Sequence, residues 1–381
     1  MSNSFYVTRN TMPQRQITLK EVAQKAGVSI MTASRALRNQ ANVTQVTRDK
    51  VQKAAAQLNY RPNPLVSALM SYRRASRVVR DTLTIAFLTN FPRREGWRTL
   101  RINQDFFDGA ALACMRHGYK LEEFWLRESD MTARRLSSIL YSRNINGILV
   151  APLPVALGHI RLDWPNFSAV ALGYSLAWPR LHRAVNHQFR SIRTALRRLR
   201  KLGYHKIGLA LRSSIDERVE HHYTGGFLVD QQRIPAAYRI PLHMVADRDW
   251  TEKSFVKWFS KYRPEVVVSH HEEVVDWLAA MKVRVPQDCG FIHLNLPDNS
   301  GRLAGIYQNG PEVGAAAADF LVAMLQRNER GIPELAHPIL VEGTWTDGKT
   351  LLPRSNYGGG EYSKRRRDEQ LRPLETGAVE R

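Results

Sequence analysis

The segment Ile17–Leu37 constrains the fold most, because it holds two short helical patterns separated by a glycine. Thr18 and Glu21 have the spacing of a capping box, which starts a helix. Gly27 follows that helix and suits the left-handed conformation of a tight turn. Ser29 then caps a second helix, in which Ala33 and Leu37 face inward. The first helix is predicted to bury a stripe at helical spacing, made by Leu19, Val22, Ala23 and Ala26.

A third helical pattern follows over Thr47–Leu58. Three helices this short can close one small core, to which the third contributes Val51, Ala54, Ala55 and Leu58. Two short helices across a glycine turn form a helix-turn-helix, whose second helix enters the DNA major groove. The alternative is a helical hairpin with a basic surface. The sequence therefore predicts an all-α, three-helix DNA-binding domain over residues 17–60.

The positive charge of the chain is concentrated near its N-terminus. The formal net charge is +21. Residues 1–81 hold 14 Lys and Arg against 3 acidic residues, residues 82–353 hold 35 against 27, and residues 354–381 hold 7 against 5. A strong positive charge attracts polyanions, nucleic acid first and anionic membrane second. The distribution indicates a basic N-terminal module on a milder body.

From Leu83 onward apolar strands alternate with amphipathic helices, which predicts βαβ units and two parallel sheets. The predicted strands are Leu83–Thr89, Leu121–Leu126, Gly147–Ala151, Ser168–Leu172, Lys206–Leu211, Val266–Ser269, Gly290–Leu294 and Pro338–Glu342. The predicted helices are Asp105–His117, Thr132–Arg143, Ser191–Leu202, Val219–Gln232, Lys253–Tyr262, Glu273–Met281 and Pro311–Gln326. The expected organisation is a flexible arm (1–16), the helix-turn-helix domain (17–60), a hinge helix and linker (61–81), an α/β domain (82–353) and a disordered tail (354–381).

Several function classes are disfavoured by what the sequence lacks. Cys114 and Cys289 are the only cysteines, so we expect no disulfide framework and a reducing, cytoplasmic compartment. No signal peptide is seen, and no apolar run approaches the roughly 18 residues of a membrane helix. No phosphate loop, nucleophile elbow or Cys-His pair is present, so we expect neither an enzyme nor a cofactor. The pairs His221-His222 and His270-His271 lack a third ligand at metal-site spacing, so no metal is expected.

The stretch Ile17–Arg74 resembles the DNA-binding and hinge region of the lactose repressor/galactose repressor (LacI/GalR) family of bacterial transcription regulators. The matching segments are consecutive and correctly ordered: Thr18–Ser29, Thr32–Leu37, Val43–Val51 and Leu58–Asn63. The resemblance implies a sequence-specific regulator, a repressor, that binds a palindromic double-stranded DNA operator as a homodimer. A small-molecule effector, such as a sugar or sugar derivative, is expected to control it.

By this resemblance, three residues stand where the family reads base edges: Ile30, Met31 and Arg35. Arg35 is suited to a bidentate contact with guanine, and the two apolar side chains are suited to thymine methyl groups. The alternative for Ile30 and Met31 is packing in the core. The hydroxyls expected to position phosphates belong to Thr18, Ser29, Thr32, Ser34, Thr44 and Thr47, and further phosphate or base contacts are expected from Arg38 and Asn42.

The hinge is predicted to begin at Asn63-Pro64 and to run only about two turns, to Met70. A helix this short is marginal alone in water. In the family, two hinge helices pair in the minor groove and a leucine wedges into a base step. By position that leucine is Leu69, which shares a face with Leu65. The alternative is a plain linker whose leucines pack on the next domain.

Residues Leu83–Glu342 resemble, through the same family, two-lobed periplasmic sugar-binding proteins whose ligand lies between the lobes. The residues at family cleft positions are Arg218, Tyr223, His270, Asn295 and Gln308. Tyr223 stands where many sugar-responsive members place an arginine, and Asn295 stands where they place an aspartate, so a standard sugar effector is in doubt. The alternative is that these residues only satisfy surface or core hydrogen bonds.

There are two alternatives to the ligand-controlled regulator. One is a constitutive DNA-binding protein whose α/β domain serves only dimerisation or another protein. The other is a solute-binding protein or sugar enzyme, which the N-terminal motif and the missing signal peptide disfavour. No heptad-rich C-terminal helix is seen, so a dimer is favoured over a tetramer.

Overall fold

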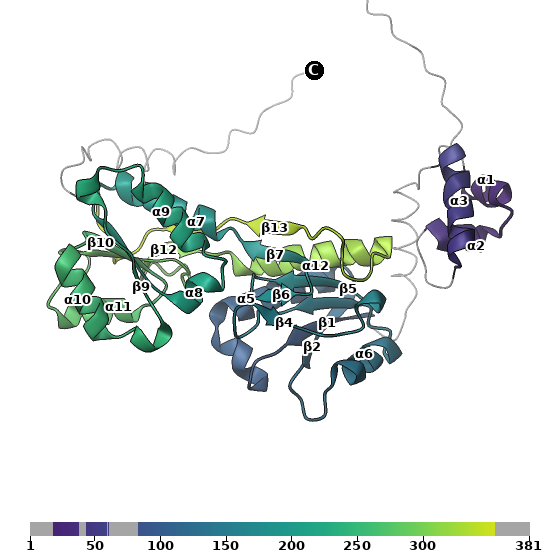
Figure 1. The fold of residues 1–381 in the computed structure, drawn as a ribbon, viewed down its shortest axis with the longest axis horizontal. Coiled ribbons are helices and arrows are strands. Elements are labelled where there is room, and N and C mark those ends of the chain that lie inside the picture. The colour runs from purple at the N-terminus through teal and green to yellow at the C-terminus, as the bar shows by residue number, and fades with distance from the viewer. Residues whose placement is uncertain (1–17, 38–42, 59, 61–82, 355–381) are drawn as a thin grey trace, which may run out of the picture.

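The computed structural model describes residues 18–37, 43–58, 60 and 83–354 (Figure 1). The described residues form a small helical part and two α/β lobes (Figure 1). The predicted arm, hinge and linker lie outside them, as does the predicted tail except Arg354. That residue is joined to the second lobe, since its backbone N–H donates to the Leu202 carbonyl at 2.9 Å.

The helical part consists of α1 (Leu19–Ala26), α2 (Ile30–Leu37) and α3 (Gln45–Gln57). Its core is built from small side chains, so three short helices can approach closely. The third helix starts two residues before its predicted start, because the Thr44 hydroxyl accepts the Thr47 backbone N–H and caps it. The fully buried members of this core are Val22, Ala23, Ala26, Ala33, Ala36, Val43, Val51, Ala54 and Ala55.

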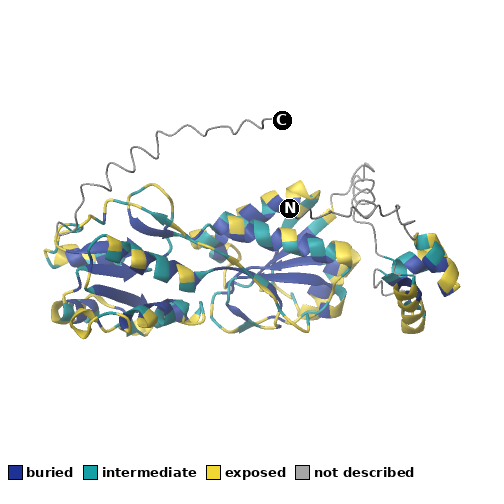
Figure 2. Cartoon of the chain, turned by 90° about the horizontal axis from the view of Figure 1, so that it is seen from above, coloured by how far each residue is buried: buried dark blue, intermediate teal, exposed yellow. Residues whose placement is uncertain are grey.

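Lobe one contains a six-stranded parallel sheet in the order β13-β7-β5-β3-β1-β2. Its central strands are buried along their length (Figure 2), as expected for a parallel sheet covered on both faces. The strands are β1 (Leu83–Thr89), β2 (Tyr119–Trp125), β3 (Gly147–Val150), β5 (Ser168–Leu172), β7 (His182–Asn186) and β13 (Pro338–Val341).

Two helices of lobe one, α5 (Arg101–Arg116) and α12 (Gly310–Arg327), pack with almost no space between their backbones. A Cβ at Gly314 would lie 2.0 Å from the Phe106 carbonyl oxygen, and one at Gly109 would lie 1.9 Å from the Pro311 carbonyl oxygen. Glycine is therefore required at this crossing. Helix α6 (Ala133–Ser142), the short pair β4 (Gly158–His159) and β6 (Leu176–Trp178), and the 3-10 turns η1 (Arg94–Thr99) and η2 (Trp164–Asn166) complete the lobe.

Lobe two contains a second six-stranded sheet in the order β14-β12-β11-β10-β8-β9, in which only β14 is antiparallel. Its strands are β8 (Ile207–Arg212), β9 (His243–Val245), β10 (Val266–Ser269), β11 (Gly290–His293), β12 (Ala304–Tyr307) and β14 (Thr344–Thr346). Its helices are α7 (Gln188–Lys201), α8 (Ser213–Glu217), α9 (His222–Gln231), α10 (Glu252–Tyr262) and α11 (Glu273–Ala280), with 3-10 turns η3 (Ala236–Tyr238) and η4 (Asp247–Asp249).

The chain passes between the lobes three times. It crosses from β7 to α7, returns from β12 to α12, and crosses again from β13 to β14. None of the described helices is long and apolar enough to cross a lipid bilayer.

One predicted helix, Val219–Gln232, is wrong in its first turn. The chain there forms α8, then a turn in which Glu220 and His221 have positive φ angles of 53° and 58°, and only then α9. The fully buried carboxylate of Asp216 stabilises this turn by accepting hydrogen bonds from the hydroxyl and the backbone N–H of Thr224. Apolar periodicity does not reveal such a hydrogen bond, so it predicts a helix that continues through the turn.

Other predicted elements differ at their ends by one to four residues. Strand β2 begins at Tyr119 rather than Leu121, and α5 begins at Arg101 rather than Asp105. The short strands β4, β6, β7, β9, β12 and β14 are absent from the predicted strands. They are two to five residues long, and in such short segments hydrophobic alternation is too brief to register.

Candidate nucleic-acid interface and ligand cleft

The turn between α1 and α2 has the geometry of a helix-turn-helix. The Thr18 backbone N–H donates to the Glu21 carboxylate at 2.7 Å, and the Thr18 hydroxyl accepts the Glu21 backbone N–H at 3.4 Å. Gly27 ends α1 with φ +64°, and the next residue, Val28, donates its N–H to the Ala23 carbonyl at 3.0 Å. The prediction of two helices with Gly27 at positive φ between them is confirmed.

The first turn of α2 presents two large apolar side chains to solvent. Ile30 is 49% exposed and Met31 is 63% exposed, while Ala33 and Ala36 hold the helix against the core. The alternative that Ile30 and Met31 pack in the core is therefore wrong. Arg35 lies one helical turn after Met31 and is partly exposed. An exposed helix start with apolar side chains and a nearby guanidinium has what reading base edges requires.

The hydroxyls assigned to phosphates are engaged in capping. Ser29 Oγ accepts the Thr32 backbone N–H at 3.0 Å and lies 2.8 Å from the Thr32 hydroxyl. Thr44 and Thr47 form an equivalent pair, with hydroxyls 2.9 Å apart. Thr18 plays the same capping role, and Ser34 is partly buried. A phosphate contact by any of these hydroxyls stays a prediction. Outside the described residues lie Arg38, Asn42, Asn63, Leu65 and Leu69.

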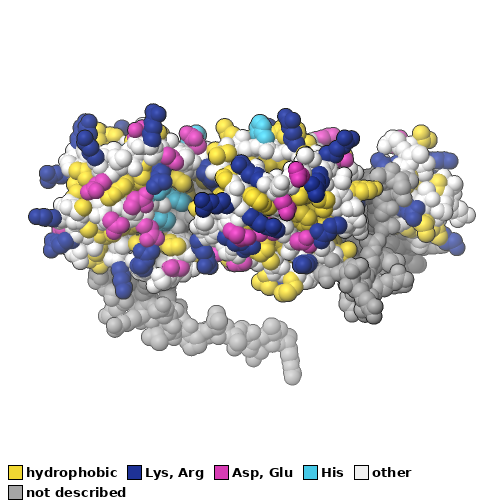
Figure 3. All heavy atoms as spheres, turned by 90° about the horizontal axis from the view of Figure 1, so that it is seen from below, with side chains coloured by type: hydrophobic (Ala, Val, Ile, Leu, Met, Phe, Trp, Pro, Cys, Tyr) yellow, Lys and Arg dark blue, Asp and Glu magenta, His cyan; other side chains and the backbone are white. Residues whose placement is uncertain are grey.

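A second candidate site lies where the carboxyl ends of the strands in the two lobes face each other. In parallel α/β sheets, ligands bind outside the carboxyl ends of the strands. His270 follows β10, Asn295 comes two residues after β11, and Gln308 follows β12. On the opposite side Pro154 follows β3. Figure 3 shows histidine side chains at the seam where the two lobes meet.

Arg218 bridges the two lobes. It follows α8 in lobe two, and its Nη1 donates to the Pro154 carbonyl of lobe one at 2.7 Å. Burial lowers the pKa of the Arg218 guanidinium. Two further contacts join the lobes: Arg183 Nη1 lies 3.4 Å from a Glu220 carboxylate oxygen, and the rings of Tyr174 and His222 are 5.0 Å apart. All three contacts come from the segment 218–222 of lobe two, so the lobes touch along this segment.

Three histidines at this seam are kept neutral by burial. Burial, followed by the nearby His293 ring, lowers the pKa of His270 to about 3. Burial lowers the pKa of His293 to about 4 and that of His271 to about 3. The rings of His270 and His293 are 5.5 Å apart. Because His293 Nδ1 accepts the Asn295 backbone N–H at 3.1 Å, its ring proton is assigned to Nε2.

Tyr223 and Gln308 are more deeply placed than the other predicted cleft residues. Each is 1% exposed. The Tyr223 hydroxyl donates to Gln188 Oε1 at 2.7 Å, and burial raises its pKa. Gln308 Nε2 donates to the Leu294 carbonyl at 2.5 Å, and the Gln308 carbonyl accepts from Asn186 Nδ2. These bonds hold the crossing segments together, so ligand contact by either side chain stays a prediction.

The sequence did not single out His293. It is the polar residue at the end of the apolar strand β11, directly beside the carboxyl end of β10 in register with Ser269. The available sequence signal was a polar residue at the end of an otherwise apolar buried strand. In the sequence, His271 stands out only as part of the pair His270-His271, which lacks a third metal ligand. Its ring is 4.7 Å from Trp250, and its Nδ1 is 3.6 Å from a Glu273 oxygen.

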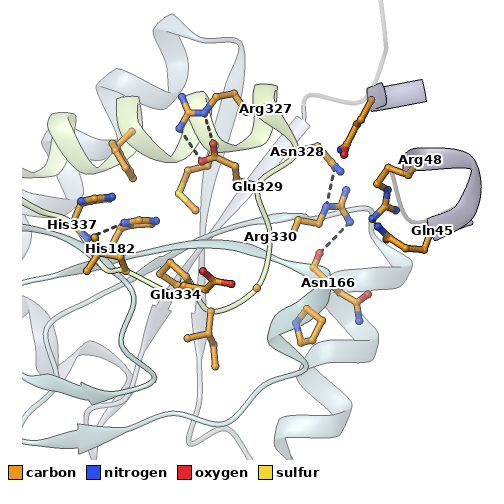
Figure 4. Close-up of a pocket in the computed structure, with 18 residues that line it drawn as sticks. Gln45, Arg48, Asn166, His182, Arg327, Asn328, Glu329, Arg330, Glu334 and His337 are labelled. Atoms are coloured by element: carbon orange, nitrogen blue, oxygen red, sulfur yellow. Dashed lines mark hydrogen bonds and ion pairs between the residues drawn. The ribbon is translucent and has the colours of Figure 1, made fainter. Parts of the chain in front are cut away.

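A large open hollow lies elsewhere, between α3 and the far end of lobe one (Figure 4). Two of its arginines are hydrogen-bonded locally: Arg327 pairs with Glu329, and Arg330 donates to the Asn328 side chain and the Asn166 carbonyl. The hollow is bounded by the helical part rather than by lobe two, so it is distinct from the predicted cleft.

Comparison with known proteins identifies the N-terminal domain. Residues 18–63 match the family described as bacterial regulatory proteins, lacI family. The HTH-type transcriptional regulator GntR of Pseudomonas aeruginosa is 49% identical over 63 residues, which cover 16% of this chain and 18% of that relative. The match thus spans less than a fifth of the relative's length.

The architecture beyond that domain is shared with solved regulators. A transcriptional regulator CelR–cellobiose complex aligns over 88% of this chain and all of that chain, with a TM-score of 0.51 and 17% identity. The lac repressor dimer bound to operator and the anti-inducer ONPF aligns over 89% of this chain and all of that chain, with a TM-score of 0.50 and 20% identity. At these identities the likeness concerns the fold. Residues 18–63 are thus similar to the lacI-family domain, and the described residues share their overall fold with these solved regulators.

Proposed function

We propose that this chain is a sequence-specific transcription regulator, a repressor, that binds a two-fold symmetric operator as a homodimer. The observation that carries the proposal is the start of α2, where Ile30 and Met31 are exposed beside Arg35 in a domain matching the lacI family. Apolar side chains are rarely left exposed together on so small a domain without a binding role. Reading thymine methyl groups accounts for them.

In this proposal α2 lies in the major groove and the capping hydroxyls face the sugar-phosphate backbone. A capping hydroxyl accepts a backbone N–H and keeps its own proton, so it can still donate to a phosphate oxygen. Ser29 and Thr44 each accept such an N–H, and each also shares a hydroxyl–hydroxyl bond, with Thr32 and Thr47 respectively, so one hydroxyl of each pair keeps a proton to donate. The described helical residues also carry more basic than acidic side chains, which favours a polyanion.

The minor-groove role of Asn63, Leu65 and Leu69 belongs to the same proposal and rests on sequence position. Leu69→Ala should reduce operator bending and weaken specific binding by about a few kcal/mol, the scale of one unstacked base step. The bend angle on a palindromic operator measures this. An unchanged bend would remove the wedge from the proposal.

The α/β part is proposed to bind a small-molecule effector between its lobes. The two-lobed fold, and the polar residues after β8, β10 and β11 at the seam, support this. One solved relative was obtained with cellobiose and another with the anti-inducer ONPF, so ligand binding is compatible with this fold. We assign the chain a regulatory rather than an enzymatic role.

The proposal is tested by selecting bound fragments from random DNA with the purified full-length protein. We expect the selected fragments to contain an inverted repeat. We expect sedimentation analysis to show that a dimer of the protein binds it. Arg35→Ala should weaken binding to the best operator by about 1–3 kcal/mol and change binding to random DNA much less. Lys53→Ala on α3 is the matched control, because it removes one positive charge away from α2. Selection of no sequence, or equal losses on both DNAs for Arg35→Ala, contradicts base reading.

A further inference from the structure

The guanidinium of Arg218 carries a charge that the described structure does not neutralise. Its one hydrogen bond is to the Pro154 carbonyl across the seam. Burial lowers its pKa, and no carboxylate in the described part of the chain forms an ion pair with it. Burying a charge without a counter-charge is costly, and proteins avoid it unless the group is used.

The other arginines around the seam are paired. Arg212 Nη2 lies 2.7 Å from Glu273, and Arg302 Nη2 lies 2.8 Å from Glu272. Arg183 is paired with Glu220. These acidic side chains are thus occupied, and the fully buried Asp216 is bonded to Thr224. The acidic groups of the surrounding loops therefore leave Arg218 as a surplus positive charge.

The surroundings of this charge are donors of hydrogen bonds. His270 is close enough for the charge of Arg218 to contribute to the lowering of its pKa. His270 and His293 are neutral, so each ring carries one N–H donor and adds no charge of its own, and the His270 backbone takes part in hydrogen bonding to both rings. In His293 the donor is Nε2, because Nδ1 accepts from the Asn295 backbone. A guanidinium whose charge acts on His270, with the His293 ring 5.5 Å from that imidazole, has the chemistry of an anion site.

We propose that the ligand of the inter-lobe cleft is a small organic anion, whose carboxylate or phosphate group pairs with Arg218 and accepts hydrogen bonds from His270 and His293. This rests on the proposed function in so far as the ligand is the effector. A neutral sugar would leave the guanidinium charge uncompensated, whereas an anion supplies the missing counter-charge.

The same geometry links the anion to the lobes. An anion that takes hydrogen bonds from Arg218 competes with the Pro154 carbonyl, which is the acceptor in lobe one. Binding therefore exchanges a direct bond between the lobes for one that runs through the ligand. Because the contacts differ between the free and bound states, ligand can shift the balance between lobe arrangements.

The test compares neutral compounds with anionic compounds of the same skeleton on the full-length protein. The probes are glucose, gluconate and glucose 6-phosphate, with inorganic phosphate alone, each at millimolar concentration. A ligand that binds the native state raises the melting temperature. We expect gluconate or glucose 6-phosphate to raise it and glucose to leave it unchanged. A response to gluconate identifies a carboxylate ligand, and a response to the two phosphate compounds identifies a phosphate ligand.

Three variants assign the effect to Arg218. Arg218→Gln should weaken anion binding in calorimetry by about tenfold or more, because a charge-assisted contact is lost. Its melting temperature without ligand should equal or exceed that of the wild type, since an uncompensated charge is removed. Arg218→Lys should retain part of the response. Arg233→Gln removes an exposed arginine beyond the far end of α9 and should bind the anion as the wild type does.

The inference is overturned if only glucose raises the melting temperature, if no anionic probe does, or if anion binding survives Arg218→Gln. A lower melting temperature of unliganded Arg218→Gln also overturns it, because the arginine would then serve as a structural latch to Pro154. Operator binding is measured separately. A protein that selects an inverted repeat yet ignores anions refutes this inference alone, and one that binds anions but no operator refutes the proposed regulator.

Discussion

The helix-turn-helix and the proposed inter-lobe site differ in how their candidate functional residues come together in space. The residues of the first lie within 30 positions of one another, in Thr18–Thr47, and α2 points them outward from a core of alanines and valines. The proposed inter-lobe site draws on loops after β3, β8, β10 and β11, which come together only when the two sheets fold. A surface read by one helix is a local property. A pocket between sheets is a property of the whole α/β part.

If this contrast holds, damage to one region should leave the other intact, and the largest effect should come from the small core. Val22→Asp places a carboxylate at a fully buried position of α1 and should destabilise the helical part by about 4 kcal/mol or more, enough to unfold it. DNA binding should be lost while anion-induced stabilisation of the α/β part persists. Exposed Gln24→Asp is the control on the same helix. Loss of both functions would show that the regions are coupled.

The reverse experiment targets lobe two beside His293. Gly305 has φ +155°, and a Cβ there would lie 2.0 Å from the His293 carbonyl oxygen. Gly305→Ala should therefore cost about 3 kcal/mol or more from strain and displacement of β11. Ligand binding should be impaired and binding to random DNA retained. Gly225→Ala in α9 meets nothing within 4 Å and should fold as the wild type does, which provides the comparison.

The neutral histidines predict a pH dependence confined to the α/β part. The folded pKa values of His270 and His293 are about 3 and about 4, below the ordinary 6.5, so the unfolded chain binds more protons between these values. Stability should be complete above pH 6.5 and fall as the pH drops toward 4, by up to about 1.4 kcal/mol per pH unit for each histidine. The charged and titratable groups acting on the pair are Arg218, His271, Glu273 and Arg302.

Chemical unfolding at several pH values measures this slope. The double variant His270→Asn, His293→Gln should flatten it, whereas His159→Gln, an exposed histidine of lobe one, should not. A slope that is unchanged in the double variant would mean that other groups cause it.

The smallest expected effect separates capping from DNA contact. Thr18→Ala removes the cap of α1 and should lower the stability of the helical part by about 1 kcal/mol. Thr18→Ser keeps a hydroxyl and should restore most of that stability. If Thr18→Ala weakens DNA binding even where the helical part is fully folded, and Thr18→Ser restores it, the hydroxyl contacts phosphate as well. Equal DNA affinity for all three proteins would leave Thr18 a cap only.

The helix-turn-helix can be predicted from the sequence because each signal there is local. A cap at Thr18, an apolar stripe through Val22 and Ala26, and Gly27 at the turn all act within one or two helical turns, so neighbouring residues suffice to predict the result. The alternation of strands and helices likewise predicts the two-sheet architecture, since central strands such as Val266–Ser269 are buried along their length and mostly apolar.

Which polar side chains meet depends on the three-dimensional packing of the lobes. His270 and His293 are 23 positions apart and become neighbours because β10 pairs with β11 in register. Arg218 reaches Pro154, 64 positions away, because a buried Asp216 stabilises the turn after α8. The depth at which Tyr223 of α9 lies depends on the hydrogen bond from its hydroxyl to Gln188 of α7. Such contacts depend on strand order, on close packing and on the burial of single charges, and none of these has a period that a linear pattern can show.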